Sequence, residues 1–175
     1  MKFTETPIQG AVLVELEKHE DHRGYFSRAF CKKEFDKHGL EHTIVQCNFS
    51  RSLKKGTLRG MHYQLPPYSE VKMVRCVKGS IYDVIVDLRE NSPSYKQSFG
   101  VKLTDVDYKM LYIPKGLAHG FQTLANDSVI FYMVTEFYQK DSERGVRWND
   151  PAFNINWPLE VAEISEKDKA YSDYQ

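Results

Sequence analysis

Residues 56–64, GTLRGMHYQ, place a guanidinium at Arg59 and an imidazole at His62 within one strand-like run. Histidine is the usual side chain for proton transfer at neutral pH, and arginine binds phosphate through its forked donors. Side chains alternate between the two faces of a regular strand, so residues three apart would face opposite sides. A β-bulge at Gly60 could re-aim one of them toward a shared site. Without a bulge, the case for a shared site weakens. The alternative for His62 is the structural role that most histidines of β-proteins have.

Three further side chains could act in the same chemistry. Lys72 lies inside an apolar run, His119 follows the turn in IPKGLAHGF (residues 113–121), and Tyr132 lies in an apolar segment. Together with His62 and Arg59 they supply a base, an ammonium, a second imidazole and a phenol. Such groups can move protons next to a carbonyl on an anionic substrate. The alternatives are a solvent-facing Lys72 and a core position for Tyr132.

The histidines also raise the alternative of a metal site. Metal-binding barrels of the cupin type use a His-x-His pair, a glutamate and a later histidine, but the position two residues after His62 is Gln64. Two histidines without a well-placed carboxylate are a poor donor set for a transition metal. No GxGxxG dinucleotide motif is present either. We therefore expect neither a catalytic metal nor another cofactor.

Short strands separated by turn residues dominate the chain. Apolar alternation and turn signals predict strands at residues 8–16, 25–30, 43–50, 58–64, 71–77, 81–88, 97–103, 110–113, 121–124 and 129–138. Residues 20–24 read as a charged turn. Residues 32–38 predict a helix that ends before Gly39, residues 165–168 a capped helical turn, and residues 145–158 a loop that wraps over the barrel. This pattern predicts an all-β, double-sheet jelly roll.

The alternation of the predicted strands places polar side chains on faces that could line a barrel interior. Gln46 and Asn48 share one face of their strand, and Lys72 and Tyr132 lie on the corresponding face of theirs. We expect these faces to enclose a polar cavity. The alternative is that they point to solvent.

Composition narrows the class of protein. A chain of 175 residues is long enough for one domain over residues 1–175, and the formal net charge of zero argues against a general nucleic-acid binder. Three cysteines without a CxxC pattern favour a reducing compartment. The first residues lack the apolar stretch of a signal peptide, and no apolar run is long enough to span a membrane. We therefore expect a cytoplasmic protein without a membrane partner.

The chain resembles the dTDP-4-dehydrorhamnose 3,5-epimerase family over roughly residues 8–168. The resemblance rests on residues 56–64, on KMVRC (72–76), IPKGLAHGF (113–121), WND (148–150) and SEKD (165–168), which occur in the family's order and spacing. It implies a cupin-like jelly roll, a homodimer without metal, and a nucleotide-diphosphate 4-keto-6-deoxyhexose as substrate. It also implies a pathway that makes deoxysugars for surface polysaccharides or glycosylated metabolites.

By position, the resemblance implies His62 as the general base, Asp168 as its orienting partner, Tyr132 as the acid on the opposite face of the sugar, and Lys72 as the cation near the C4 oxygen. It implies substrate contacts for Arg23, Gln46, Asn48, Arg59, His119, Glu143 and Lys167, and stacking of Tyr138 on the base. Arg28 occupies a substrate-contacting position where the family typically has an acidic residue. A mono-epimerase, a 3,4-ketoisomerase and a non-catalytic nucleotide-sugar-binding module are the competing interpretations.

Overall fold

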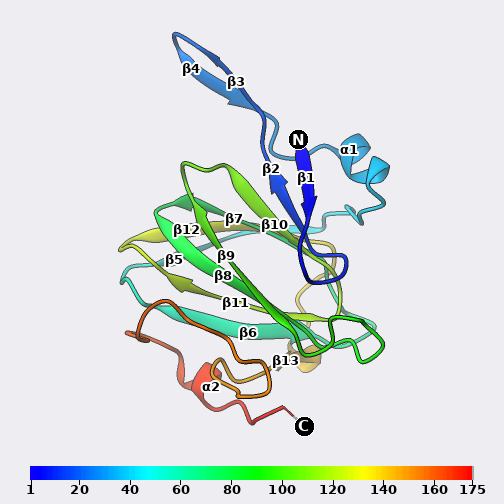
Figure 1. The fold of residues 1–175 in the computed structure, drawn as a ribbon, viewed down its shortest axis with the longest axis vertical. Helices are drawn as coiled ribbons and strands as arrows, with labels where there is room; N and C mark the ends of the chain where they lie inside the picture. The colour runs from blue at the N-terminus through cyan, green and yellow to red at the C-terminus, as the bar shows by residue number, and fades with distance from the viewer. Residues whose placement is uncertain (175) are drawn as a thin grey trace.

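Two antiparallel sheets form the body of the protein, in a computed structural model that describes residues 1–174 (Figure 1). The larger sheet contains, in spatial order, β1 (Lys2–Glu5), β2 (Val12–Glu15), β10 (Lys109–Ile113), β7 (Lys72–Lys78), β12 (Ser128–Val134) and β5 (Gln46–Ser52). The smaller sheet contains β13 (Glu143–Gly145), β6 (Leu58–Gln64), β11 (Leu117–Thr123), β8 (Ser80–Asp87) and β9 (Ser98–Thr104). The expected jelly roll is therefore confirmed.

The main core lies between the two sheets. Val74 and Ile130 of the larger sheet pack with Ile85, Leu103 and Phe121 of the smaller one, all nearly or fully buried. Each such apolar side chain contributes about 1.5–3 kcal/mol by leaving water. This apolar packing holds the sheets face to face, so that polar side chains on the same inner faces are kept opposite one another.

Two short helices cover different parts of the barrel. Helix α1 (Lys32–Lys37) buries Phe35 in a cluster with Val14, Met73 and Met110, and it ends before Gly39, which has the expected positive φ of 65°. Helix α2 (Glu166–Lys169) begins at Ser165, whose Oγ accepts a hydrogen bond of 3.1 Å from the backbone N–H of Asp168. Both helices confirm the sequence prediction. No described helix is long and apolar enough to cross a membrane.

The hairpin of β3 (Lys18–Asp21) and β4 (Gly24–Ser27) projects from the barrel, at the opposite end of the molecule from α2 (Figure 1). The sequence prediction of a charged turn at residues 20–24 and a strand at 25–30 was wrong in its boundaries. All four side chains of β3 are exposed, so this strand has none of the apolar alternation that marks a buried strand. We call this hairpin the arm.

Other strand boundaries also differ from the prediction. Strands β1 and β13 were not predicted, because each is short, lies at a sheet edge and carries few apolar residues. Strand β11 begins at Leu117 instead of residue 121, and β12 ends at Val134 instead of residue 138. The glycine in LAHGF weakened the strand signal of β11, although this segment pairs along its whole length with β8.

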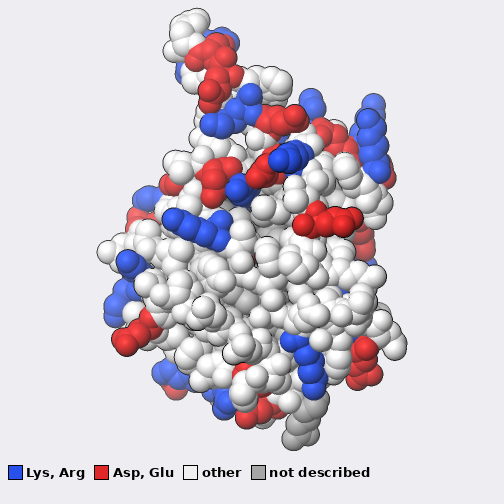
Figure 2. Space-filling model, viewed as in Figure 1, with Lys and Arg blue, Asp and Glu red and all other residues white. Residues whose placement is uncertain are grey.

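The segment after β13 wraps over the outer face of the smaller sheet, as expected. Val146, Phe153 and Trp157 pack with Tyr82 and Val84 of β8, and Trp157 Nε1 donates a hydrogen bond of 2.8 Å to the carbonyl of Trp148. The segment then leads the chain back to β6. On the face shown in Figure 2, acidic and basic side chains are intermixed, in keeping with the net charge of zero.

Candidate active site

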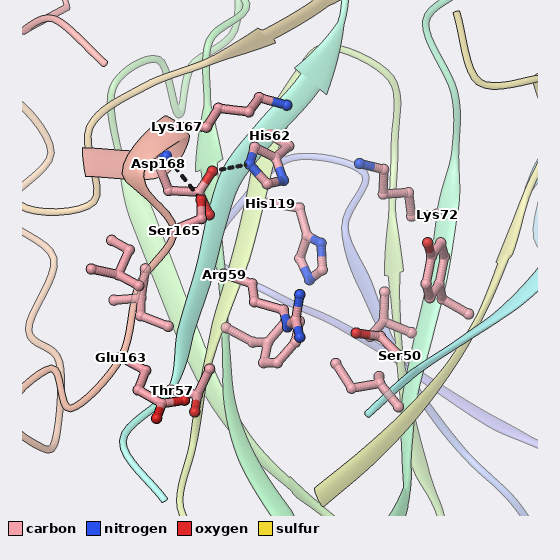
Figure 3. Close-up of a pocket in the computed structure, with 16 residues that line it drawn as sticks. Ser50, Thr57, Arg59, His62, Lys72, His119, Glu163, Ser165, Lys167 and Asp168 are labelled. Atoms are coloured by element: carbon pink, nitrogen blue, oxygen red, sulfur yellow. Dashed lines mark hydrogen bonds and ion pairs between the residues drawn. The ribbon is translucent and has the colours of Figure 1, made fainter. Parts of the chain in front are cut away.

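A cavity of about 650 Å³ opens between the two sheets (Figure 3). A volume of this size suits a small-molecule ligand. An adjoining pocket of about 200 Å³ shares His62, Lys72 and Tyr132 with it and is also lined by Gln46 and Asn48. The polar inner faces predicted from strand alternation therefore do line cavities, and they do not face bulk solvent.

A β-bulge in β6 turns Arg59 and His62 toward the same cavity. His62 pairs with His119 of β11, and Arg59 pairs with Phe121, so two residues of β6 lie opposite the single residue Gly120. Arg59, His62 and His119 all line the cavity (Figure 3). This confirms the expectation that Gly60 lies within a bulge.

Glycine is required at position 60 for two separate reasons. Its φ is +120°, a conformation that L side chains rarely adopt, and a Cβ there would lie 2.5 Å from the Cα of Gly120 and 2.7 Å from the carbonyl oxygen of His119. The contacting atoms are backbone atoms of the neighbouring strand. A Cβ on Gly120 of β11 would likewise lie 2.7 Å from the carbonyl oxygen of Arg59, so this close approach needs glycine on both strands.

We expect Gly60→Ala to lower the free energy of unfolding by about 3 kcal/mol or more, measured by urea denaturation. Gly24→Ala is the matched control, because Gly24 has a similar φ of +127° with no atom within 4 Å of its would-be Cβ. The control incurs only the backbone strain, about 1–3 kcal/mol. If both variants lost the same free energy of unfolding, the steric contact between a Cβ at position 60 and β11 would contribute nothing to the loss.

Asp168 fixes the orientation of His62. The His62 Nε2 atom lies 2.7 Å from Asp168 Oδ1, and Asp168 Oδ2 accepts a hydrogen bond of 3.2 Å from the backbone N–H of Gly60. Asp168 is almost fully buried, whereas His62 keeps 31% of its side chain exposed. With Nε2 donating to the carboxylate, the other ring nitrogen carries the lone pair that can accept a proton.

The carboxyl group of Asp168 is held ionised despite its burial. Burial alone would raise its pKa, but the hydrogen bond from His62, the charge of His62, the backbone N–H of Gly60 and the Ser165 side chain lower the pKa below its usual value. A permanent carboxylate at this position stabilises the imidazolium that forms when His62 takes up a proton.

A second histidine–aspartate pair lies beside the first. His119 Nε2 is 2.7 Å from Oδ1 of Asp83, which is completely buried on β8, and within residues 1–174 no partner of Asp83 Oδ2 is found. Sequence reasoning missed Asp83. Its signal was a carboxylate inside the apolar run IYDVIV, which is unusual for a buried strand.

Tyr132 and Lys72 enter the cavity from the larger sheet, opposite the two histidines of the smaller sheet. Burial raises the pKa of Tyr132, Arg59 lowers it and Glu70 raises it, and the result lies above the usual value. The side chain is therefore a neutral phenol, which carries a proton that it can donate. The base and the acid expected from the sequence therefore face one cavity from different sheets.

Arg59 reaches into the cavity from β6 (Figure 3). Its Nε donates to Ser52 Oγ at 3.1 Å and its Nη2 to the carbonyl of Arg51 at 3.3 Å. No carboxylate is paired with this guanidinium in the part of the chain that the structure describes, which leaves its charge for an anion.

The predicted residues Tyr138 and Glu143 line the smaller pocket, and Lys167, which lines the main cavity, contacts Glu143. Lys167 Nζ lies 2.6 Å from Glu143 Oε2, and the Tyr138 hydroxyl donates to the same oxygen at 3.0 Å. Burial would raise the pKa of Glu143, but these two hydrogen bonds lower it below its usual value. Gln46 Oε1 accepts from the backbone N–H of Tyr138 at 3.0 Å, which links β5 to the rim.

Arg23 and Arg28 do not reach the cavity within one chain. Arg23 pairs with Asp21 on the arm and is 78% exposed, and Arg28 lies 3.6 Å from Glu34. Neither lines either of the two pockets. Their substrate contacts stay predictions. Among residues 1–174, no group of three or more His, Cys, Asp or Glu side chains is arranged to hold a metal ion.

Comparison with known proteins matches nearly the whole chain to one family. The family model described as dTDP-4-dehydrorhamnose 3,5-epimerase matches residues 5–175. An epimerase of that name from Methanothermobacter thermautotrophicus is 42% identical over 171 residues, covering 96% of this chain and 91% of the relative.

Solved structures agree. The dTDP-4-dehydrorhamnose 3,5-epimerase of Elizabethkingia anophelis superposes with a TM-score of 0.96 at 38% identity, covering 99% of this chain and 96% of its own. The Bacillus anthracis enzyme of the same name, solved with TDP and PPi bound, gives a TM-score of 0.95 at 40% identity, with 99% of each chain covered. Sequence, fold and cavity thus lead to one conclusion: the chain belongs to the dTDP-4-dehydrorhamnose 3,5-epimerase family.

Proposed function

We propose that this protein is an isomerase that epimerises dTDP-4-dehydro-6-deoxy-D-glucose at C3 and C5. The observation that carries the proposal is the arrangement of the two proton-transfer groups. His62, oriented by Asp168 at 2.7 Å, and the neutral phenol of Tyr132 line one cavity from different sheets. A substrate held between them offers one face to the base and the other to the acid.

The C4 ketone acidifies the hydrogens on C3 and C5. His62 removes the proton from one of these carbons, and the electron pair moves into the enolate oxygen at C4. Lys72 stabilises that oxygen, and removing one such donor typically lowers kcat by about 100-fold or more. Tyr132 then donates its proton to the carbon from the other face, which inverts the centre. Solvent restores both groups, and repetition at the second carbon completes the reaction without any redox step.

The remaining predicted residues suit the nucleotide diphosphate. Arg59 offers a guanidinium without a carboxylate partner, which fits the diphosphate. His119, Gln46, Asn48 and Lys167 line the same connected space and supply further polar contacts. Tyr138 is 60% exposed at the rim, where its ring could stack on the base.

A homodimer would explain the position of Arg23 and Arg28. The arm that carries Arg23 projects from the barrel (Figure 1), and Arg23 lines neither pocket of its own chain, so that it could contact a substrate only in a second copy. The exposed apolar side chains Phe26 on the arm and Phe49 on β5 are 65% and 73% exposed, and a partner could cover them. We propose that the arm of one subunit completes the site of the other.

Co-expression of two defective variants tests this exchange. Arg23→Ala and His62→Ala homodimers should each have little activity. A statistical mixture is expected to recover about a quarter of wild-type activity, because half of the dimers would be mixed and one of their two sites would have both residues intact. No recovery in dimers shown to be mixed would place Arg23 outside the partner's site.

The wider assignments follow from the proposed substrate. We propose that the protein acts in the cytoplasm, in dTDP-rhamnose formation for surface polysaccharides such as O-antigen. It needs no cofactor in the proposed mechanism, because both proton transfers use its own side chains.

Proton NMR in deuterium oxide tests the reaction with dTDP-4-keto-6-deoxyglucose and chelator-treated protein. Loss of the C3 and C5 proton signals, with appearance of the doubly inverted product, is the expected result. Loss at one carbon alone would identify a mono-epimerase, and appearance of a 3-keto product a ketoisomerase. Binding without exchange would identify a nucleotide-sugar-binding module.

A further inference from the structure

Glu70, which no step of the proposed reaction uses, forms an ion pair with Lys72. Glu70 Oε1 lies 2.9 Å from Lys72 Nζ, and the two side chains are only 8% and 16% exposed. Glu70 lies two residues before β7, which begins at Lys72, and both side chains line the smaller pocket. A shielded ion pair loses hydration on both groups and is weak as a stabilising device, so its presence beside the cavity calls for another role.

Gln64 holds the other oxygen of Glu70. Gln64 Nε2 donates to Glu70 Oε2 at 3.0 Å and also lies 2.8 Å from the carbonyl of Tyr68 and 3.2 Å from that of Phe137. Gln64 Oε1 accepts from the backbone N–H of Gln139 at 2.6 Å. These backbone partners determine which way the amide faces, so its NH₂ group is the one presented to Glu70.

Glu70 therefore receives a donor on each oxygen, from Lys72 on one side and from Gln64 on the other. Only a group that accepts at both atoms satisfies this arrangement. A glutamine at position 70 would turn its own NH₂ toward either Lys72 or Gln64, and one hydrogen bond would be lost. The carboxylate cannot rotate without breaking one of the two contacts, so it holds the lysine in one place.

We propose that Glu70 is a positioning residue that holds the Lys72 ammonium against the reacting carbonyl of the substrate. This inference rests on the proposed function. Lys72 lines both the main cavity and the smaller pocket, whereas Glu70 lines the smaller one and does not line the main cavity. A lysine side chain is flexible along four carbons, and misplacement of a catalytic group by about 1 Å can cost 100-fold in rate.

The first test is the kinetics of Glu70→Gln. We expect kcat to fall about tenfold or more with KM changed less than about threefold, because the oxygen held by Lys72 becomes negative only as the enolate forms. Glu41→Gln is the matched control, since it removes a Glu–Lys pair of the same 2.9 Å length, with Lys115, at an exposed site. Wild-type kcat in Glu70→Gln would overturn the proposal.

The second test separates positioning from a general effect on folding. In a Lys72→Ala background, Glu70→Gln should cause no further loss of kcat, because Glu70 acts through Lys72. A full additional tenfold loss would overturn the proposal, and melting temperatures identify any variant that unfolds.

A third measurement does not depend on activity. The side-chain ¹⁵N signal of the Lys72 ammonium, assigned by its absence in Lys72→Ala, should be protected from solvent exchange in the wild type and lose that protection in Glu70→Gln. Unchanged protection would overturn the inference. If the wild-type protein neither exchanged nor epimerised the substrate, the proposed function would be refuted. The Lys72 ammonium signal would still report on the contact between Glu70 and Lys72.

Discussion

His62→Ala is expected to lower the rate of C3 and C5 proton exchange about 1000-fold while leaving dTDP binding nearly unchanged. General bases contribute about 100- to 10,000-fold to such reactions. The buried Asp168 holds the imidazole of His62 by one ring nitrogen. The second ring nitrogen can accept the proton that enolisation removes from the sugar carbon. Exchange is followed by NMR in deuterium oxide, and dTDP affinity by calorimetry.

Two further variants make the His62 result specific. His42→Ala is the matched control, because His42 lies 2.6 Å from Asp36 in another histidine–aspartate pair, and neither residue lines either pocket. It should exchange at the wild-type rate. His62→Asn keeps a hydrogen-bond donor for the buried Asp168 carboxylate. A loss of exchange in this variant is therefore not caused by unfolding around an unpaired carboxylate. Substantial exchange by either His62 variant would show that another group is the base.

Much of the barrel could be predicted from the chain because buried strands carry a periodic apolar signal. Strand β6 was predicted at its observed bounds, and the polar side chains at Gln46, Asn48, Lys72 and Tyr132 correctly marked an inner cavity. The arm could not be predicted in this way. Its strand β3 is exposed along its whole length, and pairing between exposed strands leaves no hydrophobic pattern.

The site itself was only partly accessible from the sequence. Asp168 is 106 residues from His62 along the chain, and only the resemblance to a family connected the two. The structure supplies the physical reason: Leu58 N–H donates to the carbonyl of Glu163 at 2.8 Å and Ala162 N–H to that of Gly56 at 2.9 Å, which aligns the C-terminal segment with β6. These backbone contacts depend little on side-chain type, so no pattern in the sequence predicts them.

Asp83 and Glu70 were missed for a related reason. Each acts on a residue that had been identified, Asp83 on His119 and Glu70 on Lys72. A sequence reveals which residue types could react, but the partner that orients a reactive group is defined by the packing of other strands. The same limit applies to stereochemistry, because strand alternation says which face a side chain lies on and not which side chain lies across from it.

The side chain across from His62 decides whether the enzyme inverts its substrate or merely exchanges a proton. His62 belongs to β6 of the smaller sheet and Tyr132 to β12 of the larger one, and both line the main cavity. If His62 returned the proton it removed, the carbon would keep its configuration. Inversion needs a donor on the opposite face, and the neutral phenol of Tyr132, which lines the cavity from the other sheet, carries a proton that it can donate.

Tyr132→Phe is therefore expected to leave deuterium exchange largely intact while lowering the rate of inversion about 100-fold or more, since proton donation by a positioned acid typically contributes on that order. The ratio of exchanged substrate to inverted product, followed by NMR over time, measures the effect. Tyr112→Phe is the matched control: burial raises the pKa of Tyr112 to about 12, but its hydroxyl accepts from the backbone N–H of Glu41 on the other side of the larger sheet. That variant should lose stability and keep the wild-type ratio. A wild-type ratio in Tyr132→Phe would assign the opposite-face acid to another group, whereas simultaneous loss of exchange would mean that Tyr132 also takes part in removing the proton.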